Sequence, residues 1–278
     1  MSILTASLAA AAFGGGDFLG GVAARDSDWR QVVSVALGVG LLVLGAATCF
    51  GGEPAGTLPL AWCLSAGTGF AVGVSLLYRA LAEGQMTQVA PITAAIAIAV
   101  PALVDILAGK AVTGPLVLGL VAASFSAALL SGLVGGWRDG MRNRSTLIVA
   151  LGAGLGLALF YIGLDRVEAN GGGIRGALLV RATAFVAMAA VTMRCRGEAL
   201  HPRSLGIAAG AGVLDGTANL LLMMAFATGG LAETSAIASL YPVATIFLAI
   251  AFLRERPSRS QAIGLLLVIP AIFLLKST

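Results

Sequence analysis

Charge is scarce in this sequence. Only 11% of its 278 residues are Asp, Glu, Lys or Arg, whereas soluble domains contain about a quarter. Because 58% of the residues are hydrophobic, the polar residues are too few to cover a water-facing surface, and a soluble globular protein is excluded. Disorder is excluded too, since disordered chains are polar enough to stay solvated. The sequence therefore predicts a protein that is embedded in a lipid bilayer.

Histidine and cysteine are also rare. One histidine, His201, in a predicted loop, and three cysteines are too few for a disulfide framework or a metal site. We therefore predict no metal, no cofactor, no catalytic residue and no enzymatic activity. The basic residues behind the net charge of +4 are scattered between apolar runs, so nucleic acid is not an expected partner. The expected partners are a small-molecule solute and the lipid bilayer, and the sequence specifies no oligomeric state.

Long apolar runs dominate what is present. A helix that crosses about 30 Å of hydrocarbon needs about 20 apolar residues, and ten such runs alternate with short breaks rich in Gly, Pro and charge. The predicted spans are 3–22, 31–50, 59–81, 86–108, 115–135, 146–164, 174–193, 204–226, 232–253 and 258–275. The first run lacks the basic start of a secretory signal, so we expect it to be retained. The predicted fold class is an all-α integral membrane protein with ten transmembrane helices.

The second half of the chain repeats the plan of the first. A shift of 145 residues places the five early spans on the five late spans without a gap, and Gly84 then meets Gly229. Because five is an odd number, the second half must enter the membrane in the opposite direction. We predict two inverted five-helix repeats, residues 1–138 and 146–278, as in transporters that alternate between two related conformations.

The basic residues predict an orientation. Apart from Arg181, which lies within a span, they divide 12 to 4 between the odd-numbered and the even-numbered connections. Cytoplasmic loops carry the excess of Lys and Arg. The count places the odd connections in the cytoplasm and both termini outside.

Two stretches carry a family resemblance. The opening FGGGDFLGGVAAR, residues 13–25, and the stretch LYPVATIFLAIAFLRERPSRSQAIGLLLVIPAIFLL, residues 240–275, resemble the EamA-type drug/metabolite transporters of the DMT superfamily. The chain departs from the family pattern at two places. The matching turn of the first half, GKAVTG, lacks the acidic residue that the turn at 254–256 has. Phe13-Gly14 stands where the family commonly has Trp-Gly. The resemblance implies ten helices, export or import of small metabolites, and termini in the cytoplasm, which conflicts with the basic count.

Three ionisable residues lie well inside predicted spans: Asp17, Arg181 and Asp215. Such groups are costly in a bilayer and face the bundle interior or a cavity. Asp17 has no basic partner in its own half, so it is a candidate for binding a solute or a proton. Arg181, at a place where the family often carries an arginine, and Asp215 either form a structural pair or bind the solute or a proton. The sequence leaves both possibilities open.

Five further residues are candidates for the binding site. Asn219 lies one turn beyond Asp215 and faces the same side; it either contacts the solute or hydrogen-bonds across helices. Tyr78 and Tyr161 lie within spans. The pair Tyr241 and Pro242 lies on a span that the resemblance makes cavity-lining, together with spans 1, 3, 4, 6 and 8. Proline frees a backbone carbonyl group and permits a bend, so Pro91, Pro101 and Pro242 are expected to interrupt the fourth and ninth spans.

The predicted function is transport of small metabolites or drug-like solutes across the cytoplasmic membrane by alternating access, with proton coupling as an option. One alternative is an intramembrane aspartyl protease, because residues 14–17 spell G-x-G-D. That chemistry needs two carboxylates that share a proton. The protease family carries the partner carboxylate on a helix that precedes the G-x-G-D helix, whereas Asp17 lies in the first predicted span. A passive channel or a structural membrane protein is the other alternative.

Overall fold

The computed structural model describes residues 2–50, 59–84, 86–109, 113–130, 144–195 and 200–254, and a few positions between 259 and 270. All ten elements formed by these residues are helices, and no strand occurs among them. The helices are α1 (Ser2–Asp26), α2 (Trp29–Phe50), α3 (Leu60–Glu83), α4 (Met86–Leu107), α5 (Gly114–Leu130), α6 (Arg144–Ala169), α7 (Gly173–Arg194), α8 (Pro202–Phe226), α9 (Leu231–Ala238) and α10 (Pro242–Leu253).

The first eight predicted spans correspond to α1 through α8, with ends that differ by at most five residues. Helices form here because a bilayer offers no water to the backbone, so each segment must satisfy its own N–H and C=O groups. The all-helical fold is thus confirmed. The tenth predicted span, 258–275, lies almost entirely outside the described residues, so the ten-helix plan stays a prediction.

The ninth predicted span, 232–253, is interrupted next to Pro242, as the proline led us to expect. The chain forms α9, which ends at Ala238, and α10, which begins at Pro242. Between them the amide of Leu240 donates to the carbonyl oxygen of Ile237, three residues back, at 3.1 Å. The physical reason is that Pro242 has no N–H group, so a continuous helix would lose a hydrogen bond there, whereas the first position of a new helix needs none.

Proline has a different effect in α4. Pro91 and Pro101 lie inside this helix, which runs without a break from Met86 to Leu107. The expectation that they interrupt the fourth span is therefore wrong. Neighbouring helices that re-satisfy freed backbone groups explain why proline is tolerated in membrane helices.

Eight described segments are long and apolar enough to cross a membrane. They are α1, α2, α3, α4, α6, α7, α8 and the stretch Thr234–Leu253. Large apolar side chains on their outer faces are exposed, including Leu107, Met193 and Phe252 at 77%, 83% and 72%. Outward apolar surface of this kind is typical of contact with lipid.

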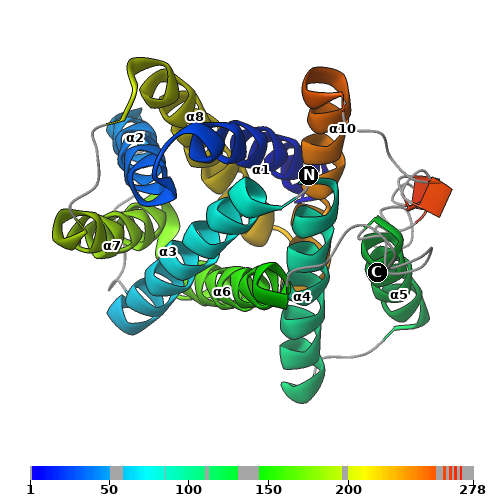
Figure 1. Cartoon of the computed structure of the whole chain (residues 1–278). Helices are drawn as coiled ribbons and strands as arrows, with labels where there is room; N and C mark the ends of the chain where they lie inside the picture. Colours follow the sequence, from blue (N-terminus) through cyan, green and yellow to red (C-terminus); the bar gives the residue numbers. More distant parts are fainter. Residues whose placement is uncertain are drawn as a thin grey trace.

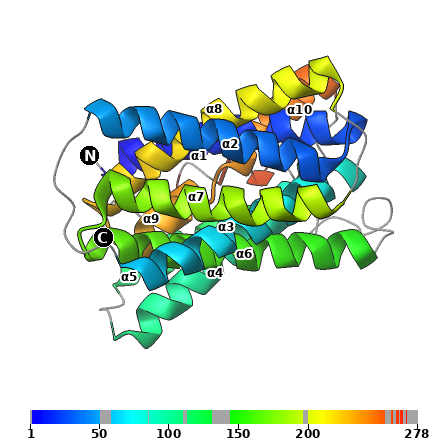
Figure 2. The ribbon, with the colours of Figure 1, turned by 90° about the vertical axis from the view of Figure 1, so that its left-hand side faces the viewer.

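Helices that are distant in the sequence pack side by side. The two most extensive contacts join α3 to α6 and α1 to α8, while α2 lies against both α7 and α8. Figure 2 shows most of the helices running along a common direction. α5 lies at the edge of the bundle, chiefly against α4 (Figure 1). The centre of the bundle is therefore formed by α1, α3, α6 and α8.

Glycine permits the closest of these contacts. A Cβ atom on Gly156 of α6 would lie 2.5 Å from the amide nitrogen of Gly73 on α3, and one on Gly73 would lie 2.8 Å from the amide nitrogen of Leu157. Any side chain at either position would push the two backbones apart. Small residues that let helices approach closely are a common packing device in membranes.

Candidate functional site

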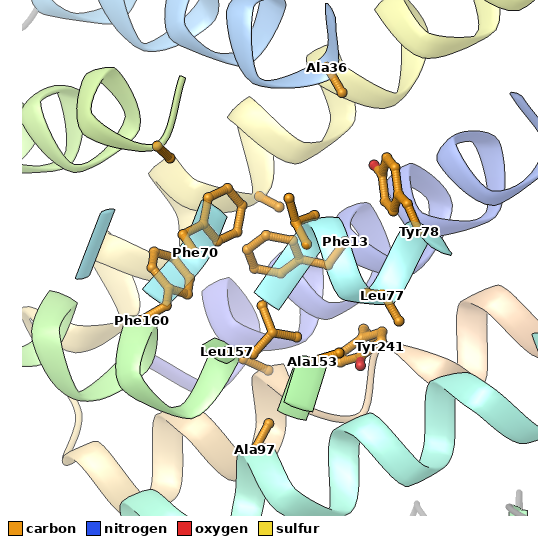
Figure 3. Close-up of a cluster of buried hydrophobic side chains, with 14 of the residues drawn as sticks. Phe13, Ala36, Phe70, Leu77, Tyr78, Ala97, Ala153, Leu157, Phe160 and Tyr241 are labelled. Carbon is orange, nitrogen blue, oxygen red and sulfur yellow. The ribbon is translucent and has the colours of Figure 1, made fainter. Parts of the chain in front are cut away.

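A small cavity lies at the centre of the bundle. It measures about 10 Å³, which is room for about one water molecule. Its wall comes from α1, α3, α6, α8 and the link between α9 and α10, and the lining residues are Phe13, Asp17, Phe70, Val74, Leu77, Leu157, Phe160, Tyr161, Asp215 and Tyr241. Figure 3 shows Phe13, Phe70 and Phe160 turned toward one another, with Leu157 beside them. The cavity is thus an enclosed apolar chamber with two carboxylates in its wall.

Asp17 enters the cavity from the middle of α1. It is 7% exposed, and no hydrogen bond or ion pair holds its carboxylate among the described residues. The glycines around it bring other helices close: a Cβ atom on Gly16 would lie 3.3 Å from the carbonyl oxygen of Ala211 on α8. Asp215 lies in the wall of the same cavity. Asp17 is therefore a buried acid whose charge no described residue neutralises.

Arg181 of α7 and Asp215 of α8 form a buried ion pair. Nη1 of Arg181 donates to Oδ2 of Asp215. The guanidinium carbon also lies 4.6 Å from the centre of the Phe70 ring, within the range of a cation–π contact. Arg181 is only 1% exposed and does not line the cavity. Arg181 therefore contacts Asp215 and Phe70 from outside the cavity wall, and its positive charge is paired with Asp215.

One nitrogen atom of the Arg181 guanidinium makes no hydrogen bond within the described part of the chain. Nη2 of Arg181 is buried and has no hydrogen-bond partner among the described residues. A buried donor without a partner costs about 1–3 kcal/mol. The pairing of Arg181 with Asp215 is thus incomplete at one nitrogen.

Aromatic rings close one side of the cavity. The ring centres of Phe70 and Phe160 are 4.5 Å apart, and those of Phe160 and Tyr161 are 5.5 Å apart, each pair tilted by about 43°. These distances are those of favourable aromatic pairs. The series Arg181, Phe70, Phe160 and Tyr161 therefore connects the ion pair of α7 and α8 with α6.

The link between α9 and α10 and the start of α10 are held against α1 and α4. The Thr245 hydroxyl donates to the carbonyl oxygen of Gly14 at 3.0 Å, and the Tyr241 hydroxyl donates to the carbonyl oxygen of Ala90 at 3.4 Å. Tyr241 is 1% exposed and contributes to the cavity wall. The helix break thus lies at the depth of the cavity, next to the segment of α1 that carries Asp17.

The structure separates the sequence-predicted residues into two groups. Asp17, Asp215, Tyr161 and Tyr241 line the cavity. Arg181, Asn219, Tyr78 and Pro242 do not line it. Asn219 donates from Nδ2 to the backbone oxygen of Asp215 at 2.9 Å, and the Tyr78 hydroxyl donates to the backbone oxygen of Gly16 at 3.4 Å. In the second group, Tyr78 connects α3 with α1 and Arg181 connects α7 with α8, while Asn219 bonds within α8.

Sequence reasoning missed the apolar part of the wall. Phe13, Phe70 and Phe160 resemble any other phenylalanine in an apolar span, so composition does not distinguish them. One signal was present for Phe70, because the 145-residue shift places it on Asp215. The expectation that α4 lines the cavity is wrong, since none of the lining residues belongs to it; Tyr241 fills the space between α4 and the cavity.

Metal chemistry finds no support in this region. Groups of three or more His, Cys, Asp or Glu that could hold a metal ion are absent from the part of the chain that the structure describes. The cavity offers two carboxylates and two tyrosine hydroxyls instead. Such a wall can bind a solute or carry a proton.

Comparisons with known proteins agree with this architecture. A solved structure titled only "Crystal structure of protein" superposes with a TM-score of 0.72, covering 96% of this chain and 98% of its own, at 14% sequence identity. At that identity the likeness concerns the fold alone. No curated protein matches the sequence. The family model described as EamA-like transporter family matches residues 144–277. The second half of the chain thus matches the EamA-like transporter family, which belongs to the DMT superfamily.

Proposed function

We propose that this multi-pass membrane protein transports small metabolites or drug-like solutes across the cytoplasmic membrane by alternating access. The observation that carries the proposal is the enclosed cavity at the centre of the bundle, with Asp17 and Asp215 in an otherwise apolar wall. Ionisable residues inside membrane bundles mark solute or proton pathways. The match of residues 144–277 to a transporter family supports the same conclusion.

The break between α9 and α10 supports transport as well. Transporters commonly bind their solute where a membrane helix is discontinuous, near the middle of the bilayer. Here the break adjoins Tyr241, which lines the cavity. A break of this kind lets α10 tilt while α9 stays in place. Such a movement would open and close the cavity beside it.

We also propose that residues 1–138 and 146–278 are inverted five-helix repeats. Helix boundaries support this, since adding 145 to Met86 and Leu107, the ends of α4, gives Leu231 and Phe252, close to the start of α9 and the end of α10. The same shift relates α1, α2 and α3 to α6, α7 and α8. The family model matches one unit of this size, residues 144–277.

The helix contacts support the repeats independently. Under the proposed repeats, α3 corresponds to α8 and α6 corresponds to α1. The contact of α3 with α6 therefore has the contact of α8 with α1 as its counterpart, and these are the two most extensive contacts in the bundle. Likewise, the contact of α2 with α8 has the contact of α7 with α3 as its counterpart. Such a pseudo-twofold arrangement gives a transporter two related conformations that open to opposite sides.

Proton coupling is part of the proposal, with Asp17 as the group that carries the proton. Asp17 lies in the cavity, and no described basic residue pairs with it. Asp215 is less suited to this role because Arg181 holds its carboxylate. A carboxylate that can lose its proton to water when the cavity opens links solute movement to proton movement.

Transport by the reconstituted protein tests the proposal. Purified protein in liposomes should move protons or charge when a transported solute is added, and no molecule should change covalently. Asp17→Asn should abolish the solute-dependent proton movement, whereas Asp26→Asn, on the exposed end of the same helix, should retain it. Folded wild-type protein that moves no solute from a broad amine, amino-acid and nucleoside panel under imposed pH gradients would contradict transport.

A second function deserves the same test because two carboxylates share the cavity. An aspartyl protease needs two carboxylates that share one proton. The ion pair of Arg181 with Asp215 opposes this arrangement, since it stabilises the ionised form of one of the two. A cleavage product from a transmembrane peptide that disappears in Asp17→Asn, without solute flux in the wild type, would favour the protease.

A further inference from the structure

The charges around the cavity do not cancel. Asp17 and Asp215 carry two negative charges, and Arg181 supplies one positive charge. Arg181 is bound to Asp215 and does not reach the cavity surface. With all three ionised, one negative charge is left over, and it lies on Asp17, in the wall of the cavity.

The rest of the wall favours a solute with an aromatic or bulky apolar body. Five of the ten lining residues are aromatic, although aromatic residues make up only 6% of the chain. The faces of aromatic rings attract cations, and more strongly where water is excluded. An apolar body would bury its surface against Val74, Leu77 and Leu157.

Other solute classes fit this wall poorly. An anion would meet two carboxylates, and Arg181, the positive charge that the described residues bring near the cavity, is already paired with Asp215. Sugars and polyols need a hydrogen-bond partner for most of their hydroxyl groups. Besides the carboxylates, the wall offers only the hydroxyls of Tyr161 and Tyr241, and that of Tyr241 already donates to Ala90.

We propose that the cavity binds an organic cation, a solute with one positive charge on an aromatic or bulky apolar body. The charge lies against Asp17, and the body lies among Phe13, Phe70, Phe160 and Leu157. This inference rests on the proposed function, in which the central cavity is the place where the solute binds.

The closed cavity has room for about one water molecule, so the solute enters only when the walls separate. α1 carries Asp17 and Phe13, whereas α3 and α6 carry Phe70, Phe160 and Leu157. Separation of α1 from the α3 and α6 pair therefore opens the space between the carboxylate and the rings. Cation binding stabilises the conformation in which the cavity is open or partly open.

Three ligands of equal size test the proposal on the wild-type protein. They are 3-phenylpropylamine, which is a cation at pH 7, the neutral 3-phenylpropan-1-ol and the anionic 3-phenylpropanoate. Binding to protein in nanodiscs is measured by equilibrium dialysis at one pH. We expect the cation to bind at least about tenfold more tightly than the alcohol, because a charge-assisted hydrogen bond contributes more than a neutral one, and the anion not to bind. Equal binding of cation and alcohol, or preference for the anion, would overturn the proposal.

Two variants locate the binding site. Asp17→Asn should weaken the binding of 3-phenylpropylamine by about tenfold to a hundredfold and leave that of the alcohol unchanged. Asp26→Asn removes the same charge from the exposed end of α1 and should change neither. Phe160→Leu should weaken both ligands, whereas Phe247→Leu, at a position 68% exposed, should weaken neither. Unchanged affinity of the cation in folded Asp17→Asn protein would place the cation elsewhere and refute the site.

The outcome separates this inference from the proposed function. Liposomes that transport a neutral or anionic solute, with no cation bound by the protein, would refute the organic cation and leave the transporter intact. A cation that binds through Asp17 while no solute of any charge is moved would support the site and refute transport.

Discussion

At the scale of single residues, the ion pair of Arg181 with Asp215 is the most consequential feature. Both residues are buried, one on α7 and one on α8. Taking two charges out of water is expensive, so removing one partner leaves the other uncompensated, whereas removing both does not. Asp215 also lines the cavity. The pair can thus act on folding and on transport, and the two effects can be separated.

Single and double substitutions separate them. Arg181→Ala and Asp215→Ala should each destabilise the fold by about 3–5 kcal/mol, which fluorescence size-exclusion chromatography would detect as a loss of folded protein. The double variant should regain most of the yield but show no transport in liposomes, because it lacks the carboxylate that Asp215 presents to the cavity. Transport restored together with the yield would show that the pair is only structural and would leave Asp17 as the principal polar residue of the site.

At the scale of elements, the packing of α3 on α6 depends on backbones that touch without side chains between them. The contact between Gly73 and Gly156 is closer than any residue with a Cβ atom allows. Both helices also carry cavity residues, Phe70 on α3 and Phe160 on α6. The distance between these two helices therefore sets the distance between the two rings.

Gly156→Ala should consequently lower stability by about 1–3 kcal/mol, the usual cost of overpacking. The melting temperature of the purified protein in detergent is the measurement. Gly206→Ala on α8 is the control, because a Cβ atom there would meet nothing within 4 Å, and alanine is the better helix former. A Gly156→Ala protein as stable as the control would mean that α3 and α6 can separate without cost.

Much of the element level was predictable from the sequence. Apolar runs of membrane length placed α1 through α8, because in a bilayer hydropathy and helix coincide. The break before Pro242 was predictable from the proline. The unbroken course of α4 through Pro91 and Pro101 was not, because neighbouring helices can satisfy the backbone groups that a proline frees. The aromatic wall was not predictable either, since helices that are apolar on every side give no period from which to choose the inner face.

At the scale of the whole molecule, the direction of the chain in the membrane is the main prediction. The excess of Lys and Arg in the odd-numbered connections predicts that these connections are cytoplasmic. The end of α7 carries Arg194 and an exposed cysteine, Cys195, in the seventh connection. The end of α6 carries the exposed Asn170 in the sixth connection. These two positions lie at opposite ends of α7 and report on opposite sides of the membrane.

Labelling of single cysteines in intact cells checks the orientation. With Cys49 and Cys63 replaced, the remaining Cys195 should resist a membrane-impermeant maleimide until the cells are opened. With all three native cysteines replaced, Asn170→Cys should be labelled from outside at once. The reverse pattern would place the termini in the cytoplasm, as the family resemblance implies.

The ion pair has a further consequence because it occurs in one half only. Under the 145-residue shift, Arg181 falls on Ala36 and Asp215 falls on Phe70, so the first half carries a small and an aromatic residue where the second carries opposite charges. In a protein whose halves exchange conformations, the pseudo-twofold axis would relate the two end states in shape only. Their energies differ, since α7 and α8 keep a charged contact in a conformation that α2 and α3 hold with apolar groups. Under the proposed alternating access, we expect the empty protein to rest with its cavity biased toward one side of the membrane, so that a solute supplies the difference by binding the other form more tightly.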